Sequence, residues 1–365
     1  MITRRLPPWF VNALLVPLAS VLCGFVVAGL VVAATGSDPI AAFSSLFQGA
    51  FTNQDAFAET LVSTTPYLFL GLGIALGFRA GLFNIGAEGQ YYVGGLAGVF
   101  LAYSIHGVPG LIEIPLALAA GMLGGFVWSG IAGALKARFG AHEVITTIML
   151  NYVAFLLANY LIDGGLMLAP HVSTPRTPEI DANAQLPIII PGSRLHFGLI
   201  LALVAVPLVW FLLQRTTLGF RLRSVGFNPT AARANGMSVG QTLVLSMGIS
   251  GALAGLAGIV DILGVSHHMT DTVGAGYGFD AIAVALLARS NPWGVLPAAL
   301  LFGALRNGAS FMQLDTQVSS DLISVVQATV IIFVAAPVLV RWIFRLRRQQ
   351  VAEVQITQRE ETAAV

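Results

Sequence analysis

Long apolar runs separated by short polar stretches make up most of the chain. A helix needs about 20 apolar residues to cross a bilayer, and runs of this kind predict membrane helices near residues 11–34, 58–78, 85–104, 110–135, 143–163, 195–213, 241–263 and 321–342. Two shorter apolar pieces, 278–289 and 292–306, fit either spans or re-entrant half-helices. The segment 38–52 is amphipathic, so we expect it to lie along the membrane surface.

The composition agrees with this pattern. Of the 365 residues, 56% are hydrophobic and 10% are charged, whereas soluble domains carry about 25% charged residues. We therefore expect an all-α polytopic membrane protein with about ten transmembrane helices, one pair of them short or re-entrant. Phe279-Asp280 repeats Phe83-Asn84, which suggests two related halves. The net charge of +1 gives no reason to expect nucleic acid as a partner.

The basic residues of the loops orient the helices. When the N-terminus is placed in the cytoplasm and both short pieces are counted as spans, only Arg176, Arg194 and Arg306 fall in outer loops. Both termini are then cytoplasmic. The chain divides into an N-terminal helix with a surface segment (1–55), a main transmembrane domain (56–345) and a polar cytoplasmic tail (346–365).

One basic stretch, "GFRLRSVGFNPTAARANG" (219–236), interrupts the apolar pattern on the cytoplasmic side. Asn228 suits a helix N-cap, Pro229 the first helical position and Gly236 the residue after the helix. The lead-in before Asn228 looks strand-like, and Ser238 with Gln241 forms a capping box for the next span. A short helix with both ends specified suggests a docking element for a partner. A solvated loop near lipid headgroups is an equal alternative.

The chain has no phosphate-binding loop of its own, because its lysine, Lys136, is followed by alanine. A separate ATPase, an ion gradient or no energy source at all could therefore drive it. An ion-coupled carrier would use Glu88, Glu143 or Asp280, each of which also fits a helix cap. Asp261 is interpreted as a capping or interfacial residue. We find no nucleophile–base or metal-ligand set, so we expect neither an enzyme nor a bound cofactor or metal.

Two polar motifs open predicted spans and mark a candidate substrate pathway. "GLFNIGAEGQYYVGG" (81–95) opens one, and "GAHEVITTIMLNYVAF" (140–155) opens another, with positions 143, 147 and 151 on one face. Interhelical hydrogen bonding is an equal alternative for these side chains. The glycine pairs 73/77, 94/98 and 251/255 are interpreted as packing contacts. The pathway candidates are Asn84, Glu88, Gln90, Tyr91, Glu143, Thr147, Asn151 and Asp280.

These two motifs, together with "GFRLRSVGFNPTAARANGMS" and "GFDAIAVALLARSNPWGVLPAALLFG", resemble permease subunits of bacterial ABC importers for branched-chain amino acids, simple sugars and nucleosides. The resemblance runs from about residue 60 to 306, and the first two motifs look most like the nucleoside branch. It implies a permease of the bacterial inner membrane. The partners would be an ABC ATPase that uses ATP, a second permease subunit, identical or different, and an extracytoplasmic solute-binding lipoprotein.

The resemblance also implies that 214–238 is a coupling segment whose short helix rests on the ATPase. Carried over to this sequence, its residues are Arg221, Arg223, Asn228, Pro229, Ala232, Arg233 and Gly236. The function expected is nucleoside import. The alternatives are an ion-coupled secondary transporter of small polar solutes and a simple-sugar ABC permease.

Overall fold

The computed structural model describes residues 16–270 and 273–316, with isolated positions between 325 and 332. The chain divides into two units, residues 1–37 with 324–365 and residues 38–323, and each is described by itself. In the first unit the structure describes α2 (Val16–Ala34). The predicted span 321–342 and the tail 346–365 lie outside the residues described in continuous segments.

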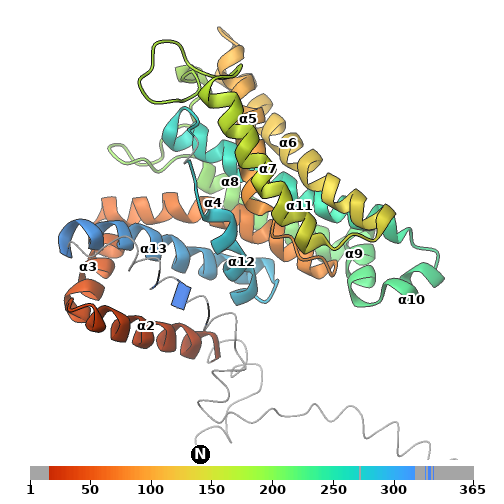
Figure 1. The fold of residues 1–365 in the computed structure, drawn as a ribbon, viewed down its shortest axis with the longest axis horizontal. Coiled ribbons are helices and arrows are strands. Elements are labelled where there is room, and N and C mark those ends of the chain that lie inside the picture. Colours follow the sequence, from red (N-terminus) through yellow and green to blue (C-terminus); the bar gives the residue numbers. More distant parts are fainter. Residues whose placement is uncertain (1–15, 271–272, 317–324, 326–327, 330–331, 333–365) are drawn as a thin grey trace, which may run out of the picture. The chain divides into compact units, whose positions relative to one another are not determined.

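The second unit is built from helices (Figure 1). Their bounds are α3 (Pro39–Phe51), α4 (Gln54–Arg79), α5 (Ala87–Ser104), α6 (Gly110–Phe139), α7 (Glu143–Asp163), η3 (Ala182–Ala184), α8 (Gly198–Arg215), α9 (Thr217–Phe227), α10 (Pro229–Ala234), α11 (Val239–Asp261), the π-helix η4 (Ile262–Ser266), α12 (Tyr277–Leu287) and α13 (Pro292–Thr316). Among the described residues, α4, α6, α7, α8, α11 with η4, and α13 are long and apolar enough to cross a membrane. The prediction of an all-α polytopic membrane protein is confirmed.

Glycines bring the central helices α5, α6 and α11 into backbone contact. A Cβ atom on Gly94 would lie 2.1 Å from the Cα of Gly255, and one on Gly125 would lie 2.1 Å from the carbonyl oxygen of Gly251. Small residues permit this close approach, which is the main source of helix association in a membrane. The interpretation of the pairs 94/98 and 251/255 as packing contacts is confirmed.

The apolar pieces at 278–306 differ from each other in the structure. α12 has 11 residues, about 16 Å at 1.5 Å per residue, which is half of a bilayer. α13 has 25 residues and does not end near 306. The prediction of a second short piece is wrong, and Arg306 lies inside a helix, not in an outer loop.

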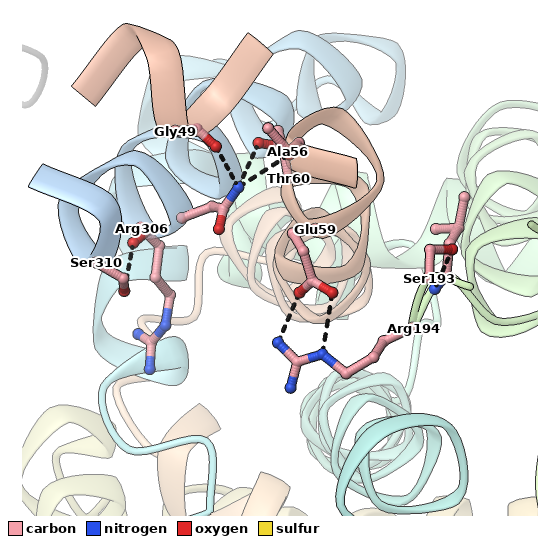
Figure 2. Close-up of polar contacts among 10 residues, drawn as sticks. Gly49, Ala56, Glu59, Thr60, Ser193, Arg194, Arg306 and Ser310 are labelled. Carbon is pink, nitrogen blue, oxygen red and sulfur yellow. Dashed lines mark hydrogen bonds and ion pairs between the residues drawn. The ribbon is translucent and has the colours of Figure 1, made fainter. Parts of the chain in front are cut away.

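The helix continues past 306 because its polar residues find partners in the protein. The side-chain nitrogen of Asn307 donates to the carbonyl oxygens of Gly49 and Ala56 at 2.8 and 3.0 Å, and to Thr60 at 3.1 Å. Figure 2 shows these three residues converging on that one nitrogen, which ties α3 and α4 to α13. A polar residue with internal partners does not have to leave the membrane.

The amphipathic character of 38–52 is confirmed, since α3 buries one face and exposes Ile40 and Phe47. The buried face packs on α13, where a Cβ atom on Gly49 would lie 2.3 Å from that of Phe311. Asp38 caps the helix by accepting from the backbone nitrogen of Ile40 at 2.8 Å. α3 therefore packs against the other helices with its buried face and leaves its opposite face exposed.

A buried histidine at the start of α8 gives a prediction about pH. Burial lowers the pKa of His196 from 6.5 to about 4, and its Nδ1 accepts from the backbone nitrogen of Gly198 at 3.2 Å. The unfolded chain then binds a proton that the folded chain does not. Stability should therefore fall by roughly 3 kcal/mol as the pH drops from 6.5 to 4. Thermal unfolding of the purified protein at pH 7.5, 5.5 and 4.5 measures this loss.

A His196→Asn variant is the control, since an asparagine side-chain oxygen can replace the Nδ1 acceptor but does not titrate. It should show a flatter dependence over the same range. An unchanged slope in this variant would assign the pH dependence to other groups.

Candidate functional site

The basic segment before α11, which the sequence placed in the cytoplasm, folds as two helices, α9 and α10, at one end of the second unit (Figure 1). The prediction of a strand-like lead-in is wrong. Thr216 caps α9 by accepting from the backbone nitrogen of Gly219 at 3.0 Å. Leu222 and Val225 are both buried, and their spacing of three is helical. Alternating arginines mimicked a strand pattern, but packing against the neighbouring helices decides the structure.

The predicted ends of α10 are confirmed. The side-chain oxygen of Asn228 accepts from the backbone nitrogens of Thr230 and Ala231, both at 3.0 Å, and Pro229 occupies the first helical position. Gly236 has a φ of 78°, the left-handed conformation that favours glycine after a helix. The prediction of a capping box at the start of α11 is wrong, because the expected side-chain-to-backbone bond of Ser238 does not form. Ser238 and Gln241 bond each other's side chains at 2.9 Å, and Ser238 makes no side-chain cap bond to α11.

α10 is anchored on one side and free on the other. Ala232 packs in an apolar cluster with Val225 of α9 and Val239 of α11. Arg221, Arg233 and Phe227 are exposed, and Phe227 is 95% exposed. Arg223 is partly buried and donates to Gln214 at 3.2 Å. We call the exposed set Arg221, Phe227 and Arg233 the coupling face. Sequence reasoning missed Phe227, although an apolar residue next to an N-cap is a usable signal.

Three of the predicted pathway residues form a buried hydrogen-bond network around the start of α5. The side-chain nitrogen of Asn84 donates to Gln90 and to Ser250 of α11, both at 2.9 Å. Asn151 of α7 accepts from the backbone nitrogen of Gly89 at 2.9 Å and donates to the carbonyl oxygen of Ile85 at 2.9 Å. These bonds join α5, α7 and α11, which is the interhelical role that the sequence left open.

The remaining residues of the α7 face, Glu143 and Thr147, lie in the first two turns of the helix. Glu143 pairs with Lys136 of α6. Thr147 donates to the carbonyl oxygen of Glu143 at 2.7 Å within its own helix. Glu143, Thr147 and Asn151 are all buried, so the shared face expected from their spacing is confirmed.

Glu88 holds the start of α12. Its two carboxylate oxygens accept from the backbone nitrogens of Gly276 and Gly278, at 2.6 and 2.5 Å. The first backbone nitrogens of a helix lack internal partners, and an anion next to them is stabilised by the helix dipole. Here the anion is a side chain of the protein, so α5 and the half-helix α12 are joined at this point.

Aromatic and charged side chains gather beside this junction. Tyr67 donates to Asp280 at 2.8 Å, and Tyr91 donates to Asp261 at 2.5 Å. The guanidinium carbon of Arg306 lies 3.9 Å from the ring centre of Tyr277. Of these residues, the sequence singled out Tyr91 and Asp280 as pathway candidates and read Asp261 as a capping or interfacial residue. The others come from distant parts of the chain, and no local pattern marks them. We call the set Tyr67, Tyr91, Asp261, Tyr277, Asp280 and Arg306 the tyrosine–arginine cluster.

The junction of α5 with α12 depends on a small residue at 278. A Cβ atom on Gly278 would lie 2.3 Å from the backbone nitrogen of Glu88 and 2.5 Å from its Cα. We expect Gly278→Ala to displace α12 and to lower the stability by about 1–3 kcal/mol, as overpacking does. Gly240→Ala is the matched control, because its Cβ would lie 3.5 Å from Ala137, an ordinary contact. Thermal unfolding in detergent compares the two variants. An equal loss of stability in both would mean that the contact of Gly278 with Glu88 is not what makes residue 278 sensitive.

Comparisons with known proteins agree with the motifs. A family model described as "Branched-chain amino acid transport system / permease component" matches residues 56–335. The guanosine ABC transporter permease protein NupP of Bacillus subtilis is 41% identical over 335 residues, which cover 90% of this chain and 95% of the relative. No solved structure matches the chain significantly.

Two further relatives differ in the solute that their names give. The nucleoside ABC transporter permease protein NupB of Lactococcus lactis is 36% identical over 331 residues, 88% of this chain and 90% of the relative. The glucose ABC transporter permease protein TsgB13 of Haloferax volcanii is 34% identical over 340 residues, 90% of this chain and 88% of the relative. The match with each extends over most of both chains, so the similarity is not confined to single motifs.

Proposed function

Because the chain belongs to the permease-component family of branched-chain amino acid transport systems, we propose that it is the membrane subunit of an ABC importer for nucleosides. The observation that carries this proposal is the 41% identity to the guanosine permease NupP over nearly the whole of both chains. The candidate membrane spans fit a multi-pass transport subunit.

The proposed energy source is a separate ABC ATPase that docks on the coupling face. α10 is short, capped at both ends and anchored to α9 and α11, so it presents a rigid surface. The exposed arginines of the coupling face, Arg221 of α9 and Arg233 of α10, favour an acidic groove on the partner. ATP is then bound and hydrolysed by the ATPase, and closure of the ATPases acts on α10.

The other proposed components follow from the family. A second permease subunit completes the membrane pathway, and an extracytoplasmic solute-binding lipoprotein delivers the solute. The proposed location is the bacterial inner membrane, with both termini and α10 on the cytoplasmic side.

Sugar import is the second candidate, and the 34% identity to the glucose permease TsgB13 favours it. A nucleoside and a sugar both offer hydroxyl groups, so hydrogen-bonding side chains alone do not separate the two. The higher identities to NupP and NupB are the reason that we place nucleosides first.

Uptake of radiolabelled guanosine tests the proposal. Cells should express this chain with and without the ATPase, second permease and binding lipoprotein encoded next to it, in the presence of an uncoupler. We expect uptake that requires the partners and persists with the uncoupler. Uptake by this chain alone that the uncoupler abolishes would replace the ABC importer with an ion-coupled carrier. Uptake of glucose but not guanosine by the full system would favour the sugar permease.

A further inference from the structure

Between η4 and α12, the described residues 267–270 and 273–276 form turns and irregular backbone and no regular helix. At one end of this segment the backbone nitrogens of Thr177 and Ile180, in the outer loop, donate to the carbonyl oxygens of Met269 and His267 at 2.9 and 3.0 Å. Ser290 follows the other end of α12, and its carbonyl oxygen accepts from Arg79 at 2.9 Å. Arg79 is the last residue of α4, so this end of α12 lies beside the end of a candidate membrane span.

At about 16 Å, α12 is too short to cross a bilayer, so as part of a span it would start inside the membrane. Irregular backbone is tolerated at that depth only where protein covers it or where it borders a water-filled cavity. Transporters place solute sites at such interrupted helices. The tyrosine–arginine cluster lies at this interruption, because Tyr277 and Asp280 belong to the first turn of α12.

Tyr277 is the centre of the cluster. Its ring centre lies 4.8 Å from that of Tyr67, which bonds Asp280, and 6.3 Å from that of Tyr91, which bonds Asp261. The guanidinium carbon of Arg306 lies over its ring, 3.9 Å from the ring centre. Helices α4, α5, α11, α12 and α13 each supply at least one residue, so the cluster lies where five elements meet.

Among the residues that the structure describes, the hydrogen bonds of the cluster engage only part of its donors and acceptors. A guanidinium has five N–H donors. Arg306 donates from Nη2 to the carbonyl oxygen of Ala275 at 3.0 Å, while its Nη1 is 3.9 Å from Asp280. The bonds to Asp261 and Asp280 engage one oxygen of each. The side chains of Arg306 and Asp280 are 30% and 20% exposed, so part of the cluster is accessible to a solute.

We propose that the tyrosine–arginine cluster is the nucleoside-binding site of the permease, an inference that rests on the proposed function. The base stacks on the flat guanidinium of Arg306, which Tyr277 supports from the other side. The ribose hydroxyls donate to the free carboxylate oxygens of Asp280 and Asp261. Chemically, the site takes a neutral ligand with one aromatic face and several hydroxyl donors.

The charge of the cluster adds a selectivity. Asp261 and Asp280 outnumber Arg306, and the carboxylate of Glu88 lies at the same helix start. A phosphate group would meet this excess of carboxylates at short range, and like charges repel strongly where water is scarce. The site therefore accepts nucleosides and rejects nucleotides. A free sugar could donate hydrogen bonds to the carboxylates, but it has no aromatic base to stack on Arg306 and Tyr277.

Saturation-transfer NMR on the purified complex in nanodiscs, with its ATPase but without the binding lipoprotein, tests the site directly. The probes are guanosine, guanosine monophosphate and ribose. We expect transfer to the base proton H8 of guanosine, weak transfer to ribose and none to the monophosphate. Arg306→Lys keeps the charge but loses the flat surface, and should weaken guanosine binding about tenfold. Tyr277→Met, which leaves every charge in place, should do the same.

Arg194→Lys is the matched control. Arg194 forms a bidentate pair with Glu59 at 3.0 and 2.6 Å, seen with Arg306 in Figure 2, and lies outside the cluster. It should bind guanosine as the wild type does. Thermal unfolding confirms that each variant is folded, and if Arg306→Lys is not, Tyr277→Met decides. Equal guanosine binding in both cluster variants, or equal binding of the monophosphate by the wild type, overturns the proposal.

ATP-driven uptake by the full system separates this inference from the proposed function. If the wild-type system does not import guanosine, the proposed function fails. If it imports guanosine and the cluster variants import it with unchanged kinetics, only the site assignment fails. Reduced uptake by the cluster variants, with normal uptake by Arg194→Lys, supports both.

Discussion

Replacing Gly125 by alanine is expected to break the contact between α6 and α11. The added Cβ would lie 2.1 Å from the carbonyl oxygen of Gly251 and 2.9 Å from the backbone nitrogen of Gly255. Both obstacles are backbone atoms, so no side-chain rotation relieves the clash. We expect a loss of stability at or above the upper end of the roughly 1–3 kcal/mol range of overpacked cores. Size-exclusion profiles after heating in detergent measure it.

Gly130→Ala makes the same substitution five residues further along α6, where an added Cβ meets nothing within 4 Å. This variant should behave like the wild type. If the two variants were equally stable, the close approach of α6 and α11 would not be a determinant of the fold.

Replacing Phe227 by aspartate is expected to separate the permease from its proposed ATPase. Phe227 is 95% exposed at the junction of α9 and α10, so the change does not disturb the interior. Exposed aromatic residues next to arginine are typical energetic centres of protein interfaces. We expect co-purification of the ATPase and ATP-driven uptake to fall at least tenfold, with unchanged thermal stability.

Leu166→Asp is the corresponding control. Leu166 is 89% exposed in the loop between α7 and α8, far along the chain from the coupling face. It should leave ATPase binding intact. Normal ATPase binding by Phe227→Asp would place the docking surface elsewhere.

Where the pattern is local, the sequence predicted the structure well. The span predicted at 143–163 has the bounds of α7, because a single polar motif starts it and glycines follow it. The caps of α10 were also predictable, since Asn, Pro and Gly have strong positional preferences at helix ends. In contrast, the lead-in at 219–227 has a mixed pattern, and the contacts of Leu222 and Val225 decide its helical conformation.

The tyrosine–arginine cluster was only partly predictable, because its contacts join residues far apart in the chain. The bond between Tyr67 and Asp280 spans 213 positions. Arg306 was placed in an outer loop because a charge after a short apolar piece usually marks the end of a span. In the structure, the ring of Tyr277 and the carbonyl oxygen of Ala275 accommodate that charge inside α13.

The anchoring of α10 to α11 has a mechanical consequence. Gly236 lies between the two helices. If this glycine were an unrestrained hinge, α10 could move without moving α11. The cluster of Ala232, Val225 and Val239 bridges that hinge, so we expect α10 and α11 to move together. α11 is 23 residues long, about 35 Å at 1.5 Å per residue, and it ends at Asp261. A single straight element thus runs from α10 to Asp261, a member of the tyrosine–arginine cluster that we propose as the solute site. A force on α10 would therefore move α11 as a whole and displace Asp261 with it. No series of side-chain rearrangements between the two ends would be needed.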